Sequence, residues 1–567
     1  MVKTRKSVSL LLAFVMVLFV TSACGSAQEP ETTQAVTQSS SEAAETTAAA
    51  SDAAAGEFQY PTTPVKFTAM WMYDWFTPPP AKWGDDKISK YIKDRFNVEM
   101  EQIGPGGDPE EKLNVLLVSN DLPDVVIMDR NSSWKKLCQM DKLVPLDDYI
   151  AKYPAYKSKI DEATMNLYRQ NGKVYGLLNW ATSKKHPMGQ GGYAINEKIY
   201  KELGSPPLKT LDDLYNYLML VKTKNVTVDG KSVIPFQGDP EASPLDKFII
   251  YTAFGGGRHL QLNPHYMHEN AEGNLEFFLK EPQWVDTMLF LNRCWNSDLI
   301  NKDVFIEKVD QVTEKLSSGR VAVYTSGSDL VDPVAKARQS WKAADPSGEY
   351  RVIEPIAAPG VNQADIWTSS YSLVGWNIIC ITKNAKDPER IYSYFDWIIS
   401  DEGQLVTFNG PKGGIWDELD ENGYPIFKQS RYELSTEEQD QYGFEYYTLP
   451  GHADFVDFAK VAGDNRLPPE KRDWVIQAQS NITWKHAKEV TEAEDLSPIS
   501  SSKEGILEEK MKQLIDPYIV KIVSAKSEQE ARSLIDEVTK KAYDAGFKTL
   551  EDFKTKIWRE NKQKMGK

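Results

Sequence analysis

The 567-residue chain contains only four cysteines and six histidines, and it has no excess of basic residues. Cys138, Cys294 and Cys380 lie far apart in the sequence, so they do not form a disulfide framework and are expected to be buried free thiols. The formal net charge is -16, and an acidic surface repels phosphate backbones. The composition therefore argues against a nucleic-acid partner.

Long apolar runs are almost absent as well. The one clear run, residues 10–20 (LLLAFVMVLFV), is shorter than the roughly 20 residues that a membrane-spanning helix needs. It follows the basic residues Lys3, Arg5 and Lys6, and it precedes small residues that end at Cys24. This pattern predicts a secretory signal over residues 1–23, and the remainder is expected to be soluble.

The junction at Cys24 resembles the lipobox of bacterial lipoproteins, although Thr21 stands where that motif usually has leucine. In those proteins the cysteine is acylated and becomes the first mature residue, whereas an ordinary cleaved signal is the alternative. Residues 24–57 have no aromatic residue, leucine or isoleucine, and such a segment is expected to be a disordered tether. We therefore expect a protein anchored by lipid to the outer face of the cell membrane.

The body of the chain, residues 58–567, is too long for one hydrophobic core. Short apolar strands are predicted at 64–71, 124–128, 174–178, 193–196, 321–324, 351–356 and 377–382. Helical patterns lie between them, so the fold class is open α/β, in which ligands bind beyond the carboxyl ends of strands. Thr210 with Asp213 predicts a capping box, and Ser527 and Thr549 are predicted N-caps of two C-terminal helices.

Several short motifs occur in an order that resembles the extracellular solute-binding lipoproteins of carbohydrate ABC transporters (family 1 type), in their larger Gram-positive subgroup. The motifs lie at 122–126 (LPDVV), 143–147 (LVPLD), 193–197 (YAINE), 203–204 (LG), 210–214 (TLDDL), 318–323 (SGRVAV), 381–385 (ITKNA) and 400–403 (SDEG). The resemblance implies a two-lobed periplasmic-binding-protein-like fold (type II). It also implies a monomeric receptor that closes on an oligosaccharide and delivers it to the permease subunits of an ABC transporter.

Each lobe is expected to hold a mixed sheet flanked by helices. The predicted lobe 1 comprises residues 58–185 and 365–425, and the predicted lobe 2 comprises residues 186–364 and 426–567, including the C-terminal helices.

A sugar presents apolar C–H faces ringed by hydroxyls, so a receptor needs aromatic plates with polar groups at their edges. Aromatic residues on predicted loops rather than at helical core spacing are the candidate plates, although each of them can equally be core. The candidate ligand-binding residues are Trp71, Asp74, Trp75, Asp129, Arg130, Asn179, Trp180, Arg258, Ser326, Trp367, Tyr371, Trp376 and Trp416. An Asp129–Arg130 surface pair is the alternative for those two residues.

No catalytic motif or cofactor is predicted. A glycan-active surface enzyme remains an alternative, because 82 acidic residues leave room for a pair of catalytic carboxylates, and a peptide receptor of the same fold is another. Related receptors often carry a calcium loop, but residues 225–236 have too few oxygen ligands, and a hairpin turning at Asp229-Gly230 is expected. His265, His268 and Glu269 match no standard zinc spacing, so no metal site is predicted.

Overall fold

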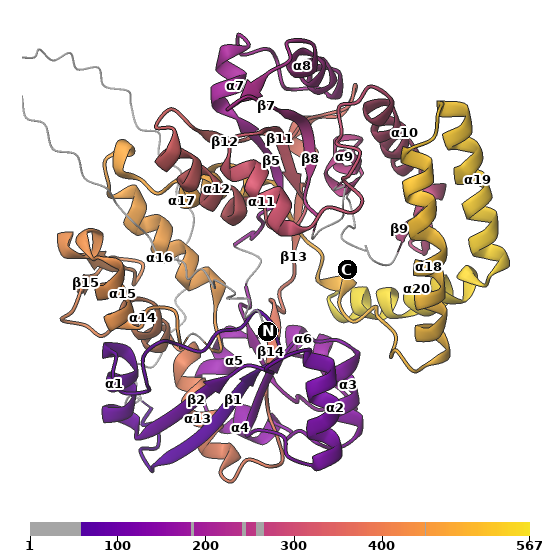
Figure 1. Ribbon diagram of the computed structural model, residues 1–567. Coiled ribbons are helices and arrows are strands. Elements are labelled where there is room, and N and C mark those ends of the chain that lie inside the picture. The colour runs from indigo at the N-terminus through magenta and orange to yellow at the C-terminus, as the bar shows by residue number, and fades with distance from the viewer. Residues whose placement is uncertain (1–57, 183–185, 241–244, 246, 257–265, 448) are drawn as a thin grey trace, which may run out of the picture.

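The computed structural model describes residues 58–182, 186–240, 245, 247–256, 266–447 and 449–567. Two mixed sheets, each covered by helices, lie one above the other (Figure 1). We call the body around the five-stranded sheet lobe 1 and the body around the four-stranded sheet lobe 2. The predicted α/β class with two flanked mixed sheets is thus confirmed.

The sheet of lobe 1 has the strand order β2-β1-β3-β14-β4. Its strands are β1 (Val65–Trp71), β2 (Val98–Ile103), β3 (Val125–Met128), β4 (Leu177–Asn179) and β14 (Asn377–Ile381). β1 is parallel to β2 and β3, whereas β14 is antiparallel to β3 and β4. Every residue of β3 and β14 is buried, as expected for central strands that are covered on both faces.

The sheet of lobe 2 has the order β12-β5-β11-β8. Its strands are β5 (Gly192–Asn196), β8 (Ile234–Gly238), β11 (Val321–Ser326) and β12 (Tyr350–Ile353). β5 is antiparallel to β11 and β12, and β11 is parallel to β8. The predicted hairpin is present as β6 (Thr227–Val228) and β7 (Lys231–Ser232), with Asp229 and Gly230 at positive φ in the turn.

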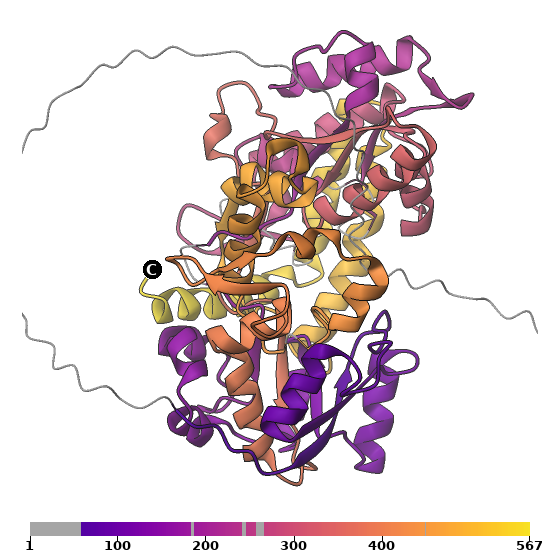
Figure 2. The same cartoon turned by 90° about the vertical axis from the view of Figure 1, so that its left-hand side faces the viewer.

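Helices cover both sheets, and two further groups of helices flank the space between the lobes (Figures 1 and 2). Lobe 1 carries α1 (Lys87–Phe96), α2 (Pro109–Ser119), α3 (Ser132–Gln139), α4 (Asp147–Lys152), α5 (Ala155–Lys159), α6 (Glu162–Tyr168) and α13 (Pro388–Ile399). Lobe 2 carries α7 (Glu197–Glu202), α8 (Leu211–Thr223), α9 (Lys247–Ala253), α10 (Pro282–Asn296), α11 (Val309–Ser317) and α12 (Val331–Ala344).

The first flanking group consists of α14 (Asp401–Asn409), α15 (Thr436–Tyr442), α16 (Ala453–Asn465) and α17 (Trp474–Asn481), with the hairpin β15 (Trp416–Leu419) and β16 (Pro425–Phe427). The second consists of α18 (Lys503–Val523), α19 (Glu528–Asp544) and α20 (Phe547–Lys564), drawn in yellow in Figure 1. α18 to α20 contribute Ile515, Val538 and Trp558 to the core of lobe 2, so this C-terminal group is part of that body.

The capping box at Thr210 and Asp213 is present at the start of α8, and Ser527 caps α19. Thr549, however, lies inside α20, which begins at Phe547 after Gly546. Tyr447 and Leu449 pack into the core of lobe 1, beyond the boundary predicted at residue 425. Tyr447 is held there because its hydroxyl donates to Asp86 at 2.7 Å.

Three segments of the chain meet where it passes between the lobes. β13 (Ser369–Tyr371) pairs in parallel with β17 (Ala487–Glu489), and Gly191 donates its N–H to the Ser369 hydroxyl. A Cβ on Gly191 would lie 2.4 Å from the Thr368 carbonyl oxygen, so glycine is required for this close approach. We call this meeting point of Gly191, β13 and β17 the crossing. It fixes which edges of the two sheets face each other.

Candidate functional site

Five aromatic rings gather at the edge of lobe 1 that faces the crossing. Trp71, Tyr73, Trp75 and Phe76 come from the end of β1 and the loop after it, and Trp376 immediately precedes β14. The rings of Trp75 and Trp376 are stacked, with centroids 5.9 Å apart and an interplanar angle of 22°. Tyr73 lies 5.0 Å from Trp75 and 5.4 Å from Trp376. We call these five residues the aromatic platform.

The platform has an open face and a buried floor. Trp75 is 58% exposed and Trp376 is 45% exposed, which is unusual for such large apolar side chains. Trp71 forms the floor, because it is buried, stacks on Phe76 at 4.9 Å and donates its indole N–H to Gln102 at 2.8 Å. Trp75 and Trp376 therefore have the open faces that a plate needs, whereas Trp71 supports them from below.

Polar groups border the platform. The Tyr73 hydroxyl donates to Asp129 Oδ1 at 2.6 Å, and burial together with that hydrogen bond raises the pKa of Tyr73 well above its usual range. Tyr73 thus stays a neutral donor at physiological pH, and the exposed Asp129 keeps further acceptor capacity. Asp74 is also exposed, in the loop between two platform residues.

The side chains of Arg130 and Asn179 both bond to backbone groups of the protein. Arg130 does not pair with Asp129; its guanidinium donates to the carbonyl oxygens of Gly375 and Asn377 and contacts Glu494. Asn179 is buried, and its side-chain oxygen accepts the N–H of Gly451 at 2.8 Å. Both side chains thus have partners within the protein, and their role as sugar contacts stays a prediction.

Trp180 and Tyr371 lie close to the crossing. Trp180 is half-buried with φ at +60°, and its ring packs against Phe408 of α14 at 5.7 Å. Tyr371 in β13 is half-buried, and burial with the nearby charges of Glu489 and Asp454 raises its pKa to about 12. Trp180 thus contacts α14, and Tyr371 lies near Asp454 of α16.

The facing edge of lobe 2 is acidic. Gly192, which begins β5 soon after the chain leaves lobe 1, pairs with Ser326 at the end of β11. The buried Ser326 hydroxyl donates to Asp239 at 2.7 Å, so Ser326 too is committed to a protein partner. Burial and the neighbouring Asp332 raise the pKa of Asp329 to about 7. Near neutral pH a substantial fraction of Asp329 is therefore protonated and can donate a hydrogen bond.

Replacing Asp329 with asparagine is expected to stabilise the protein at pH 8. The pKa of Asp329 is about 7 in the folded protein and near 3.9 in the unfolded chain. As pH rises from about 3.9 to about 7, the free energy of unfolding therefore falls, and above about 7 it falls no further on account of this group. Asp332 and Asp239 raise this pKa, whereas Lys336 lowers it. We expect Asp329→Asn to gain about 1–2 kcal/mol at pH 8 and less at pH 5. Urea unfolding at both pH values measures this.

Asp536→Asn, at an exposed position in α19, is the matched control and should show no such pH dependence. A gain for Asp329→Asn that is equal at both pH values would contradict the protonated state of Asp329.

Other predicted residues take different places. Trp416 is buried in a small core with Ile415 and Tyr442, and its indole N–H donates to the Gly410 carbonyl at 3.0 Å, so it offers no open plate. Trp367 is half-buried just after a short 3-10 turn, and Arg258 lies outside the described residues. Two features are absent from the set predicted from the sequence: Tyr73 and the acidic edge of lobe 2. The position of Tyr73 between Trp71 and Trp75 is the signal that could have identified it.

Of the histidine motif, the described residues His268 and Glu269 lie in a strand rather than in a helix. His265 lies outside the described residues, and His268 sits in β9 (Met267–Glu269), opposite Glu276 in β10 (Leu275–Phe277). His268 Nε2 lies 3.3 Å from Glu276 Oε1, and its other ring nitrogen lies 3.8 Å from Glu281. These contacts join a hairpin to its surroundings within lobe 2.

Two mixed sheets joined by a multiple crossing define the class of two-lobed solute-binding protein. Residues 85–405 match the model of the family described as bacterial extracellular solute-binding protein, and the chain belongs to this family. The resemblance inferred from the short motifs is thereby confirmed. No helix in the described part of the chain has both the length and the apolar character to cross a membrane.

Lipoprotein LipO of Bacillus subtilis (strain 168) is 25% identical over 341 residues, covering 56% of this chain and 62% of the relative. The polygalacturonan/rhamnogalacturonan-binding protein YtcQ of the same organism is 24% identical over 359 residues, covering 61% of this chain and 66% of the relative. The matches thus span less than two thirds of these relatives. Neither relative is named as an enzyme.

Among solved structures, an HMO binding ABC-transporter associated solute binding protein from Bifidobacterium longum infantis superposes with a TM-score of 0.61. The two chains are 14% identical, and the match covers 87% of this chain and 98% of that one. The likeness shows that the two chains share a fold.

Proposed function

We propose that this protein is a lipid-anchored receptor on the outer face of the cell membrane that binds an oligosaccharide between its lobes. It delivers the sugar to the permease of an ABC transporter. The observation that carries the proposal is the pair of exposed, stacked indoles, Trp75 and Trp376, bordered by Tyr73 and Asp129. Indole faces suit the apolar face of a pyranose, and a carboxylate suits its hydroxyls.

The names of similar proteins support a sugar as the ligand, because one relative is named for galacturonan binding and one structure for HMO binding. The lipobox-like sequence at Cys24 supports the anchor. Tethering keeps the receptor at a high effective concentration near its membrane partner. The mechanism is a population shift, in which contacts from both lobes favour the closed arrangement.

Titration calorimetry with a neutral tetrasaccharide (stachyose) and an acidic one (tetragalacturonate) tests the proposal. We expect saturable binding of one of them at micromolar affinity or better, and a smaller radius of gyration by X-ray scattering in its presence. Mass spectrometry of the mature protein from membranes should find acyl chains on Cys24.

Binding of neither sugar, or binding without compaction, would contradict the receptor mechanism. Steady release of shorter sugars from either probe would instead point to a glycan-active enzyme. An unacylated N-terminus would contradict only the anchor.

A further inference from the structure

Three hydrogen bonds hold the backbone around Trp376. The N–H of Trp376 donates to the Asn179 carbonyl at 3.0 Å. Arg130 donates to the two flanking carbonyls, with Nη2 at 2.9 Å from the Gly375 oxygen and Nη1 at 3.3 Å from the Asn377 oxygen. The Arg130 side chain is only 9% exposed, so these charge-assisted hydrogen bonds form in a poorly hydrated place where they are strong.

Arg130 is itself positioned by the C-terminal part of the chain. Its Nη2 lies 3.3 Å from Glu494 Oε2, so one nitrogen faces both Glu494 and the carbonyl before Trp376. The turn that carries Glu494 is fixed by α20, because the buried Asn561 side chain donates to the carbonyls of Glu492 and Glu494 at 3.1 and 2.7 Å. The location of Glu494 therefore follows that of α20.

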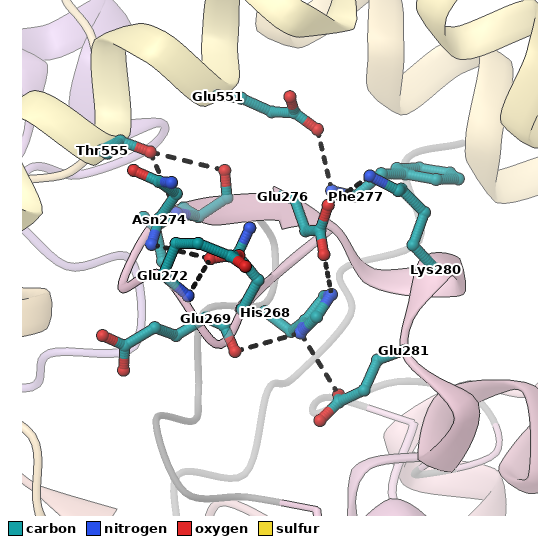
Figure 3. A network of polar contacts seen from close by, with 12 residues as sticks. His268, Glu269, Glu272, Asn274, Glu276, Phe277, Lys280, Glu281, Glu551 and Thr555 are labelled. Atoms are coloured by element: carbon teal, nitrogen blue, oxygen red, sulfur yellow. Dashed lines mark hydrogen bonds and ion pairs between the residues drawn. The ribbon is translucent and has the colours of Figure 1, made fainter.

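α20 is in turn attached to lobe 2 (Figure 3). The N–H groups of Phe277 and Leu275 in β10 donate to Glu551 at 3.0 Å and to the Thr555 hydroxyl at 2.9 Å. Trp558 of the same helix is fully buried in the core of lobe 2. A continuous series of contacts thus runs from the β9–β10 hairpin of lobe 2 to the backbone of Trp376 in lobe 1.

We propose that Glu494 is a positioning residue for the sugar plate Trp376. Through Arg130 it makes the orientation of Trp376 depend on where the C-terminal helices, and with them lobe 2, sit relative to lobe 1. The link to sugar affinity rests on the proposed function, whereas the link between Glu494 and the position of Trp376 does not. A planar guanidinium suits this role because it donates to two carbonyls and a carboxylate at once.

The neighbouring pair Lys135–Asp495 provides a matched control. Its atoms lie 2.5 Å apart across the same contact between lobe 1 and the C-terminal segment, and Lys135 also donates to the Ser497 carbonyl. Lys135 belongs to α3, and neither residue has a hydrogen bond to the segment around Trp376 among the described residues. Asp495→Asn thus removes an equal charge from the same interface, and asparagine tolerates the positive φ of this position.

The test uses the full chain labelled with 5-fluorotryptophan, in which the ¹⁹F resonance of Trp376 among the 15 tryptophans is identified by Trp376→Phe. We expect Glu494→Gln to shift or broaden the Trp376 resonance, and Asp495→Asn to leave it in place. Arg130→Lys keeps the cation but not the planar fork, so it should disturb the same resonance. For whichever of stachyose or tetragalacturonate binds, Glu494→Gln should weaken affinity about fivefold, the size of one net hydrogen bond.

An unmoved Trp376 resonance in folded Glu494→Gln or Arg130→Lys protein overturns the positioning role, as does an equal disturbance in Asp495→Asn. The fluorine measurement needs no sugar. Failure of both probes to bind would therefore count against the proposed function, while leaving the positioning of Trp376 to be decided by the ¹⁹F spectra.

Discussion

Trp376→Ala is expected to weaken binding of the recognised oligosaccharide by at least about tenfold. Truncating a large aromatic residue at the centre of a binding surface commonly costs about 2 kcal/mol or more, and 1.4 kcal/mol is a factor of ten. Trp376 also contacts Trp71, Tyr73 and Trp75, so its loss removes one ring contact from each of these three platform residues. Calorimetry with the sugar that binds the wild-type protein measures the effect.

Trp75→Ala should act in the same direction, since Trp75 is the more exposed of the two plates. Trp295→Ala is the control, because Trp295 packs against Phe305 in lobe 2 at 5.4 Å, away from the platform. All three variants should keep their folded circular dichroism spectrum. Wild-type affinity in both platform variants would show that the sugar binds elsewhere.

Much of the fold is encoded in local patterns. The strand around Val126 and the one around Ile379 are short, largely apolar runs, and such runs are typical of strands buried on both faces. Thr210 with Asp213 identified the start of α8 because a capping box is a local interaction. The prediction that Thr549 is an N-cap is wrong, because α20 already begins at Phe547. Gly546, with φ at +105°, occupies the N-cap position instead.

The site was only partly predictable, because it depends on pairings between distant segments. Trp75 and Trp376 are far apart in the sequence and meet because β3 lies between β1 and β14 in one sheet. No sequence pattern fixes that order. The sequence around a loop tryptophan also does not reveal whether its N–H meets solvent or a carbonyl, so it does not show that Trp416 is buried with its N–H bonded to Gly410.

Charged residues gave the least local information. Arg130 and Asp129 are adjacent in sequence, but the guanidinium turns toward Gly375 and Glu494 while the carboxylate accepts from Tyr73. Their partners come from distant parts of the chain. Asp129 therefore lies exposed at the border of the platform and accepts from Tyr73. The Arg130 side chain is largely buried and instead donates to the backbone on either side of Trp376.

The backbone that presents Trp376 should be as important as the ring itself, and Gly375→Ala tests this. Gly375 has φ at +66°, and a Cβ there would lie 2.5 Å from the carbonyl oxygens of both Asn179 and Trp180. The left-handed conformation alone costs a non-glycine residue about 1–2 kcal/mol, and displacing two backbone carbonyls adds to it.

We expect Gly375→Ala to lower the free energy of unfolding by about 3 kcal/mol and to weaken sugar binding about tenfold, because Trp376 must move with its backbone. Gly360→Ala isolates the conformational cost, since Gly360 has φ at +83° but no neighbouring atom within 4 Å of the point where an alanine Cβ would lie. That control should lose only about 1 kcal/mol and bind sugar normally. Equal losses in the two variants, measured by urea unfolding and calorimetry, would show that the close approach to Asn179 and Trp180 does not hold the plate in place.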